Sequence, residues 1–168
     1  MNGGIVLNHP DGLVIRRAQR EDTALVFEFI RRIAAYEKMS DQVVATEETL
    51  EKSLFDQEQA WVLVGEYQAK PVGFALFYEN FSTFIGRAGL YLEDLYVDPD
   101  MRGRGFGKAL FQAVAAEAVR RGCARMEWTC LNWNEPSIAF YRQRGAVAMD
   151  QWTTYRLAGD AIARAAQQ

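Results

Sequence analysis

Two kinds of hydrophobic pattern alternate along the chain and predict a mixture of strands and helices. Short apolar or alternating runs predict strands at 13–17, 60–67, 71–78, 90–97, 125–130 and 148–157. Segments whose apolar residues recur at helical spacing predict helices at 19–38, 46–55, 109–119 and 134–145, with a weak helical tail at 161–168. The order β-α-α-β-β-β-α-β-α-β is that of a mixed α/β fold and not of a strictly alternating parallel sheet.

The length of 168 residues fits one domain with a sizeable core. We expect a flexible, glycine-containing lead-in at 1–12, a single domain at 13–157 and a C-terminal tail at 158–168. The sequence contains neither an internal repeat nor a low-complexity linker.

The most informative stretch runs from Tyr91 to Arg121 and predicts a strand, a turn, a glycine-rich loop and a long helix. The loop consists of Arg102, Gly103, Arg104, Gly105, Phe106, Gly107 and Lys108. Its glycines allow close approach of the backbone to a ligand, and the following helix N-terminus favours an anion. A phosphate group is therefore the expected ligand. The alternative is an ordinary connection whose glycines only turn the chain.

Two nucleotide-binding motifs can be excluded for this loop. A Walker loop needs a Gly where Arg102 stands and a Ser or Thr where Ala109 stands. The dinucleotide motif G-x-G-x-x-G fails because Lys108 or Leu110 occupies its third glycine position. The remaining pattern, R-x-x-G-x-G at Arg102, Gly105 and Gly107, resembles the coenzyme A pyrophosphate loop of the GNAT N-acetyltransferases.

The composition excludes several other kinds of chemistry. A net charge of −3, without a long run of either sign, indicates neither a nucleic-acid partner nor a membrane partner. Cys123, Cys130 and His9 are too few for a closed zinc site, and His9 lies in the lead-in, so we expect no metal and no histidine mechanism. The helix at 109–119 is too short to span a bilayer and no signal peptide is evident, so we expect a cytoplasmic protein with reduced thiols.

Acetyl transfer from a thioester to an amine needs a site for the amine, a proton acceptor and a proton donor for the departing thiolate. Glu93 and Asp94 are adjacent carboxylates in an apolar strand, and strand alternation points them to opposite faces. We predict that Glu93 holds the cationic amine and receives its proton, directly or through water, whereas Asp94 is more often a structural acceptor. Tyr141 is the candidate proton donor, since a phenol with a pKa of about 10 matches a thiol of about 8.5. An amphipathic core tyrosine is the alternative.

The segment from Trp133 to Tyr141, together with the loop, resembles the GNAT superfamily. The resemblance implies the GNAT fold, a mostly antiparallel mixed sheet with flanking helices, and acetyl-CoA as co-substrate. It also implies that Tyr141 is the general acid and that the residues contacting the coenzyme include the main chain of the strand before the loop and the start of the later helix, namely Leu95, Tyr96, Val97, Asn134 and Ser137.

Further segments are similar to the diamine N-acetyltransferase group, which contains spermidine/spermine and thialysine-type enzymes: Arg16, 35–39, 91–97, the loop from Arg102, and 133–141. The similarity implies that Tyr36, Glu37 and Glu93 bind the acceptor and that the protein is a homodimer. Trp128 is a further candidate for an acceptor contact, although core or dimer packing is the expected role of the tryptophans.

Two segments depart from the polyamine enzymes of that group. The stretch 150–155 keeps one acid, Asp150, where more are typical, and 81–84 is closer to the thialysine-type branch. A short diamine or a lysine- or ornithine-like amine is therefore favoured over a long polycation. A protein or peptide N-acetyltransferase is the nearest alternative, and a non-catalytic acyl-CoA sensor is an alternative of another class.

Overall fold

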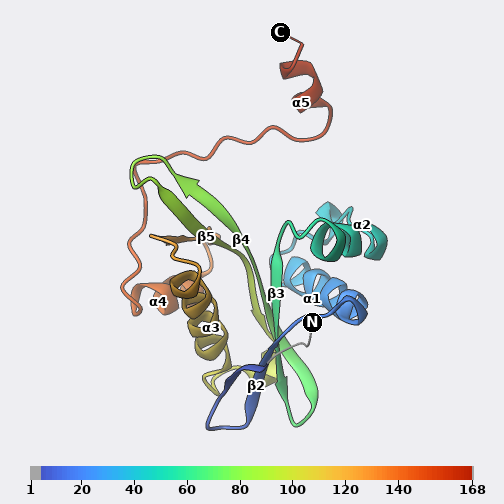
Figure 1. The fold of residues 1–168 in the computed structure, drawn as a ribbon, viewed down its shortest axis with the longest axis vertical. Coiled ribbons are helices and arrows are strands. Elements are labelled where there is room, and N and C mark those ends of the chain that lie inside the picture. Colours follow the sequence, from blue (N-terminus) through green and yellow to red (C-terminus); the bar gives the residue numbers. More distant parts are fainter. Residues whose placement is uncertain (1–4, 168) are drawn as a thin grey trace. The chain divides into compact units, whose positions relative to one another are not determined.

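The structure is a computed structural model that describes residues 5–167, and its chain divides into two compact units at residues 1–129 and 130–168. In the first unit a sheet of six strands follows the order of the chain (Figure 1). The strands are β1 (Ile5–Asn8), β2 (Leu13–Arg17), β3 (Trp61–Tyr67), β4 (Lys70–Ser82), β5 (Arg87–Val97) and β6 (Met126–Glu127). All neighbours are antiparallel except β5 and β6, which are parallel.

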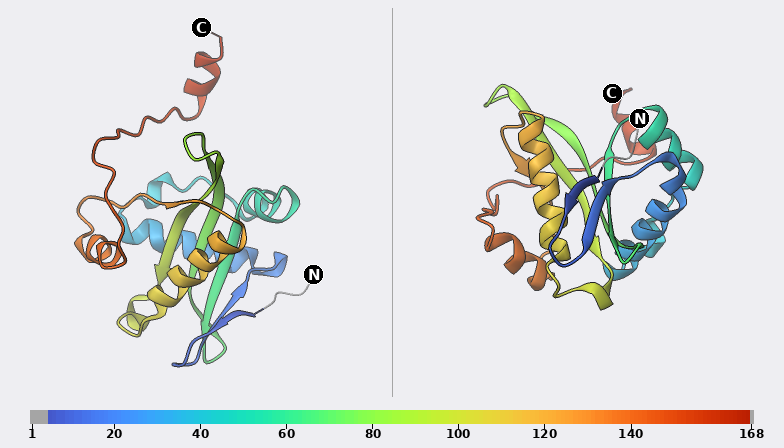
Figure 2. Two further views of the ribbon diagram at one scale, coloured as in Figure 1. Left: turned by 60° about the vertical axis from the view of Figure 1, so that its left-hand side comes forward. Right: turned by 60° about the horizontal axis from the view of Figure 1, so that its bottom comes forward.

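Helices cover both faces of this sheet (Figure 2). On one face, α3 (Phe106–Arg120) buries Leu110 and Val114 against a core that includes Leu92. On the other face lie α1 (Thr23–Tyr36) and the short α2 (Glu47–Glu51), which continues into a π-helical turn at Lys52–Asp56. There Phe29 of α1 stacks on Phe74 of β4, with ring centroids 5.3 Å apart. The amphipathic patterns of α1 and α3 explain these two separate cores.

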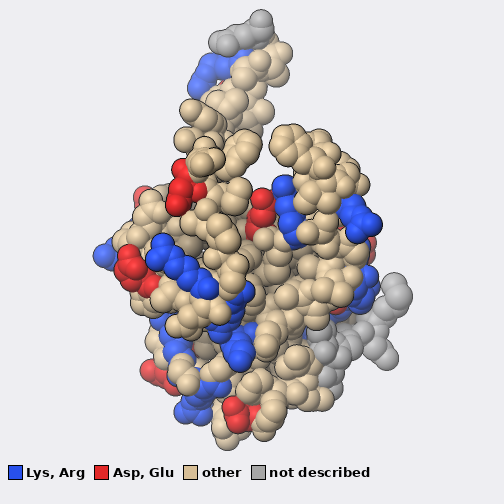
Figure 3. All heavy atoms as spheres, turned by 90° about the vertical axis from the view of Figure 1, so that its left-hand side faces the viewer, with Lys and Arg blue, Asp and Glu red and all other residues tan. Residues whose placement is uncertain are grey.

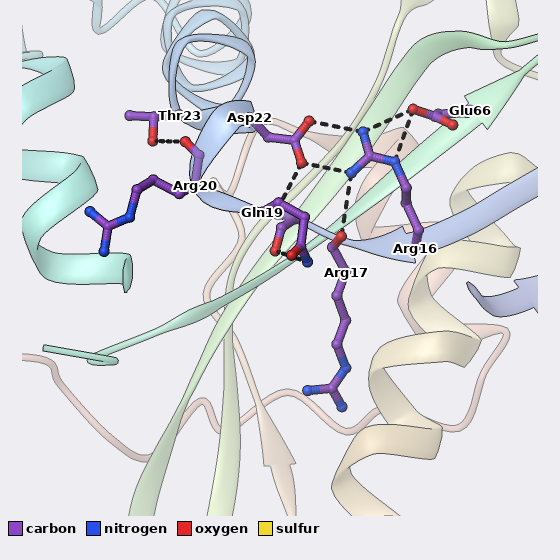
Figure 4. Close-up of polar contacts among 8 residues, drawn as sticks. Arg16, Arg17, Gln19, Arg20, Asp22, Thr23 and Glu66 are labelled. Atoms are coloured by element: carbon purple, nitrogen blue, oxygen red, sulfur yellow. Dashed lines mark hydrogen bonds and ion pairs between the residues drawn. The ribbon is translucent and has the colours of Figure 1, made fainter. Parts of the chain in front are cut away.

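Arg16 fixes the connection from β2 into α1 (Figure 4). Its guanidinium donates to both carboxylate oxygens of Asp22, at 2.6 and 2.8 Å, and its Nε donates to Glu66 of β3 at 3.0 Å. Asp22 also accepts the backbone N–H of Gln19 at 2.7 Å. A bidentate, charge-assisted contact of this kind orients both partners. Arg16 therefore fixes the position of the segment that connects β2 to α1.

The N-terminal lead-in differs from the sequence-based expectation, because part of 1–12 is a strand. β1 pairs antiparallel with β2, and residues 1–4 lie outside the described part of the chain. The turn after β1 places the His9 ring edge-on to Phe106, with centroids 6.4 Å apart. The apolar run Ile5-Val6-Leu7 is short and follows two glycines, which gave the pattern too little length to predict a strand.

The second unit contains α4 (Glu135–Arg142) and α5 (Asp160–Ala165). The strand predicted at 148–157 is wrong, since this segment forms no strand in the structure. Its large apolar side chains are exposed: 71% for Trp152, 90% for Tyr155 and 59% for Leu157. A strand forms only where a neighbouring strand pairs with its backbone N–H and C=O groups. The apolar pattern of a segment does not show whether such a neighbouring strand is present.

The predicted strand at 125–130 is reduced to Met126–Glu127, paired with Leu90 and Tyr91 of β5.

Acidic and basic side chains are interspersed on the face drawn in Figure 3. Within residues 5–167, we find no helix with the length and hydropathy needed to cross a membrane.

Candidate functional site

A β-bulge at Glu93 interrupts the middle of β5. Leu76 of β4 pairs with Asp94, and the next residue, Phe77, pairs with Leu92, so Glu93 is an extra residue without a partner in the ladder. Leu92 and Leu95 consequently pack in the same core on the α3 side, although they are three positions apart. Beyond the bulge, Asp94 and Tyr96 are two positions apart and therefore point to the same face of β5. Tyr96 packs in the core on the α1 side.

The bulge corrects the prediction that Glu93 and Asp94 point to opposite faces. Before it, Glu93 alternates with Leu92 and therefore lies on the face toward α1, and after it Asp94 lies on that face too. Alternation holds only for an uninterrupted ladder, and one extra residue reverses it. Both carboxylates thus belong to one side of the sheet.

Glu37, the residue that caps the end of α1, completes a group of acids with Glu93 and Asp94. Burial, followed by the negative charges of Glu93 and Glu37, raises the pKa of Asp94 to about 7. Burial and the charge of Glu93 also raise the pKa of Glu37. A cation placed among these groups would relieve both effects, so this acidic group suits a protonated amine.

Two tyrosines on neighbouring strands adjoin the acidic group. Tyr78 and Tyr91 pair across β4 and β5, and their rings stack with centroids 5.1 Å apart. Burial and the charge of Glu93 raise the pKa of Tyr78. Tyr78 has no local signature in the sequence, because its place beside Glu93 follows from the register of β4 and β5.

The glycine-rich loop has the backbone that its sequence predicts. A 3-10 turn at Pro99–Met101 leads into it, and Gly103 and Gly105 have φ angles of 76° and 81°, in the left-handed region that glycine tolerates best. Gly105 is the N-cap of α3, and its carbonyl accepts the N–H of Ala109. The N–H groups of residues 106–108 precede this first helical bond, and such groups at a helix start favour the binding of an anion.

The basic side chains of the loop take different directions. The Arg102 guanidinium carbon lies 4.8 Å from the ring centre of Tyr36, whereas that of Arg104 lies 5.6 Å from Tyr67 at the end of β3. Lys108 is exposed on the first turn of α3. Thus the loop contacts Tyr36, which we predicted as an acceptor-binding residue.

The strand before the loop divides its side chains between the two cores. Val97 and, in part, Leu95 pack on the α3 side, whereas Tyr96 packs on the α1 side. The predicted coenzyme contacts of these residues involve main-chain groups and stay a prediction.

Trp128 packs against the core on the α3 side of the sheet. Its ring packs edge-on to Phe111 of α3, with centroids 5.3 Å apart, on the side of the sheet opposite to the acidic group. This packing corresponds to the core role considered for the tryptophans, and a contact of Trp128 with the acceptor stays a prediction. Among the described residues, no group of three or more His, Cys, Asp or Glu side chains could hold a metal ion.

The second unit contains the remaining candidates, and it is described by itself. Asn134 is buried and caps α4, because its Oδ1 accepts the backbone N–H of Ser137 at 3.4 Å. Tyr141 lies on the same helix with its ring edge-on to Phe140, at 5.2 Å between centroids. The roles of Tyr141, Asn134 and Ser137 toward the reactants stay predictions.

Comparison with known proteins agrees with these features. A model of the Acetyltransferase (GNAT) family matches residues 26–146. A thialysine N-epsilon-acetyltransferase from Bos taurus is 35% identical over 89% of this chain and 95% of its own length. An L-ornithine N5-acetyltransferase from Arabidopsis thaliana is 29% identical over 88% of this chain and 85% of its own.

Solved structures share the fold. An integron cassette protein from the mobile metagenome of V. cholerae superposes with a TM-score of 0.75 at 26% identity, over 94% of this chain and 99% of that one. An aminoglycoside acetyltransferase from an uncultured soil metagenomic sample has a TM-score of 0.75 at 23% identity, over 89% of this chain and 97% of that one, and its likeness concerns the fold alone. The family match and the curated relatives together establish that the chain belongs to the GNAT family of acetyltransferases.

Proposed function

We propose that the protein transfers the acetyl group of acetyl-CoA to a primary amine of a small diamine, polyamine, or lysine- or ornithine-like acceptor. The observation that supports this proposal most is the bulge at Glu93, which brings Glu93 and Asp94 to one face of the sheet, where the charge of Glu37 acts on Asp94 and that of Glu93 acts on Glu37. Three acids in one place favour an acceptor that is cationic when it arrives. The names of the thialysine and ornithine relatives agree with such an acceptor.

The coenzyme belongs, in this proposal, at the glycine-rich loop. Acetyl-CoA supplies an acetyl thioester, and GNAT acetyltransferases use it as their co-substrate. The left-handed glycines, the N–H groups at the start of α3 and the exposed side chains of Arg104 and Lys108 suit a pyrophosphate, and Arg102 adds positive charge to the loop. The main chain at Leu95–Val97 would bind the pantetheine arm, and Asn134 and Ser137 would contact the coenzyme.

The transfer requires proton movements at the amine and at the departing thiolate. An alkyl ammonium group has a pKa of about 10.4, so it must lose a proton before its nitrogen can attack. Glu93 accepts this proton, directly or through water, before the nitrogen attacks. As the new carbon–nitrogen bond forms and the carbon–sulfur bond breaks, the nitrogen releases its second proton to solvent and the amide becomes neutral. Tyr141 gives a proton to the departing thiolate, whose reference pKa of about 8.5 lies below that of a phenol. No metal is needed for either step.

Acceptor length separates the candidates within this class. The segment 150–155 contains the single acid Asp150, which favours a short diamine or a lysine- or ornithine-like amine over a long polyamine. A protein or peptide acceptor and a non-catalytic acyl-CoA sensor are the other candidates.

Thiol release from acetyl-CoA, measured over a panel of diamines, polyamines, thialysine, lysine, ornithine and peptides, tests these possibilities. We expect the highest kcat/KM with a short diamine or with a thialysine-, lysine- or ornithine-like amine. Preferential turnover of peptides would indicate a protein acetyltransferase. Tight coenzyme A binding without turnover of any acceptor would indicate a sensor.

We further propose a cytoplasmic homodimer. The exposed apolar side chains of the segment 147–157, among them Val147 at 82% and Tyr155 at 90%, are a surface that a second copy could cover. Light scattering at several protein concentrations tests this assembly, and a monomeric mass at all of them would contradict it.

A further inference from the structure

Arg102, the first residue of the glycine-rich loop, directs its side chain back toward α1. Its Nε donates to the carbonyl of Val97 at 3.0 Å, and its guanidinium carbon lies 4.8 Å from the ring centre of Tyr36 and 5.8 Å from that of Tyr96. One planar group therefore contacts the end of β5 and the last residue of α1 at the same time.

The chemistry of this contact requires arginine. A guanidinium can place its flat face on an aromatic ring while an N–H in its plane donates a hydrogen bond. A lysine in the same place would keep the positive charge but could not make both contacts with this geometry. Arg102 can thus be replaced without changing the charge of the loop.

A second arginine also joins α1 to the start of the glycine-rich loop, and here the side chain comes from α1. Arg32, one turn before Tyr36 on α1, donates to the carboxylate of Asp98 at 3.0 Å, and Asp98 directly precedes the 3-10 turn of the loop. The end of α1 and the start of the loop are therefore joined by one contact from each side.

The end of α1 is also where the acceptor-binding residues lie. Tyr36 is the last residue of the helix and Glu37 its C-cap, after which Lys38 takes a left-handed φ of 60° and ends the helix. Because Glu37 is electrostatically coupled to Glu93, a shift of this corner would change the acidic group.

Building on the function proposed above, we propose that Arg102 is a positioning residue that holds the Tyr36–Glu37 corner against the coenzyme loop. Its side chain sets the acceptor site relative to the coenzyme site, while backbone N–H groups of the loop serve the pyrophosphate. The relative position of the two sites then depends on Arg102, and replacement of Arg102 changes binding of the acceptor more than binding of the coenzyme.

Steady-state kinetics of Arg102→Lys in the full-length protein test this proposal, with the acceptor that the wild type uses best. We expect the acceptor KM to rise about three- to tenfold, as for the loss of a stacking contact and one hydrogen bond. The KM for acetyl-CoA and kcat should stay within about twofold, because the charge remains and the reacting groups are unchanged. Arg31→Lys is the matched control: Arg31 lies 5.8 Å from the Phe27 ring on α1, and its replacement should leave the acceptor KM unchanged.

A double-mutant cycle with Tyr36→Leu tests whether the effect passes through the stacking contact. In the Tyr36→Leu background, Arg102→Lys should raise the acceptor KM by less than about twofold, because the contact is already lost. The proposal is overturned if Arg102→Lys multiplies the acceptor KM equally in both backgrounds, or if it raises only the KM for acetyl-CoA. A wild-type protein that acetylates no amine would instead refute the proposed function itself.

Discussion

Replacing Asp94 with Asn should stabilise the protein in a way that depends on pH. The pKa of Asp94 rises from 3.8 to about 7, mainly through burial and then through the charges of Glu93 and Glu37. One pKa unit corresponds to about 1.4 kcal/mol, so ionising Asp94 in the folded state costs about 4 kcal/mol relative to the unfolded chain. The contribution of protonated Asp94 to the free energy of unfolding is fully present below the pKa of about 4 that Asp94 has in the unfolded chain. It is lost as the pH rises through the pKa of about 7 in the folded state.

Asparagine keeps the shape of the side chain and removes this titration. Applied at pH 5 and pH 8.5, the linkage relation predicts a gain in the free energy of unfolding that is about 2–3 kcal/mol larger at the higher pH. Urea unfolding at both pH values measures the gain, and Asp41→Asn, at an exposed aspartate on a 3-10 turn, is the control that should show no such difference. Equal gains at both pH values, or a loss at pH 8.5, would refute the electrostatic origin of the effect.

The other predictions concern the reaction and the core. Tyr141→Phe should lower turnover about 100-fold with coenzyme A affinity nearly unchanged, and unchanged turnover would exclude Tyr141 as the proton donor. Glu93→Gln should chiefly impair use of the amine, whereas a loss of folding with normal acceptor kinetics would make Glu93 structural. For Glu117, burial alone would raise the pKa, but hydrogen bonds from Arg120, Arg17 and then Arg121 lower it to about 2. Glu117→Gln should therefore cost about 3 kcal/mol at pH 7, a loss that shrinks as the pH falls from about 4.5 toward 2 and is measured by urea unfolding; a loss independent of pH would argue against ionic stabilisation.

Most helices and strands of the first unit follow from hydrophobic periodicity, because each buries a regular set of apolar side chains in one of the two cores. The predicted helix at 19–38 corresponds to α1, which buries Val26 and Phe29 at the expected spacing. The hairpin predicted at 60–67 and 71–78 corresponds to β3 and β4. The strand predicted at 148–157 is wrong because exposed Trp152 and Tyr155 have the composition of a strand but lack a partner edge in this unit.

The candidate site could be predicted only as far as its chemistry is local. The glycines at 103 and 105 take the left-handed conformations that a ligand-binding turn needs, and Asn134 caps its helix as its residue type predicts. The direction of the Arg102 side chain depends on Tyr36, which lies far away in the sequence. Contacts of this kind follow from the packing of α1 on the sheet, and no local pattern encodes them.

The bulge at Glu93 satisfies two demands that a regular strand could not meet together. Leu92 and Leu95 both pack in the core on the α3 side, but residues three positions apart in a regular strand point to opposite faces. The alternation of side chains must therefore reverse between them. The reversal places the two residues in between, Glu93 and Asp94, on the same opposite face, where neither carboxylate has to enter the α3 core. Deleting one residue here would restore simple alternation, and would turn either Leu92 or Leu95 out of that core. The same extra residue therefore serves both core packing and the assembly of the acidic group that we propose as the acceptor site, so selection for either one would retain both.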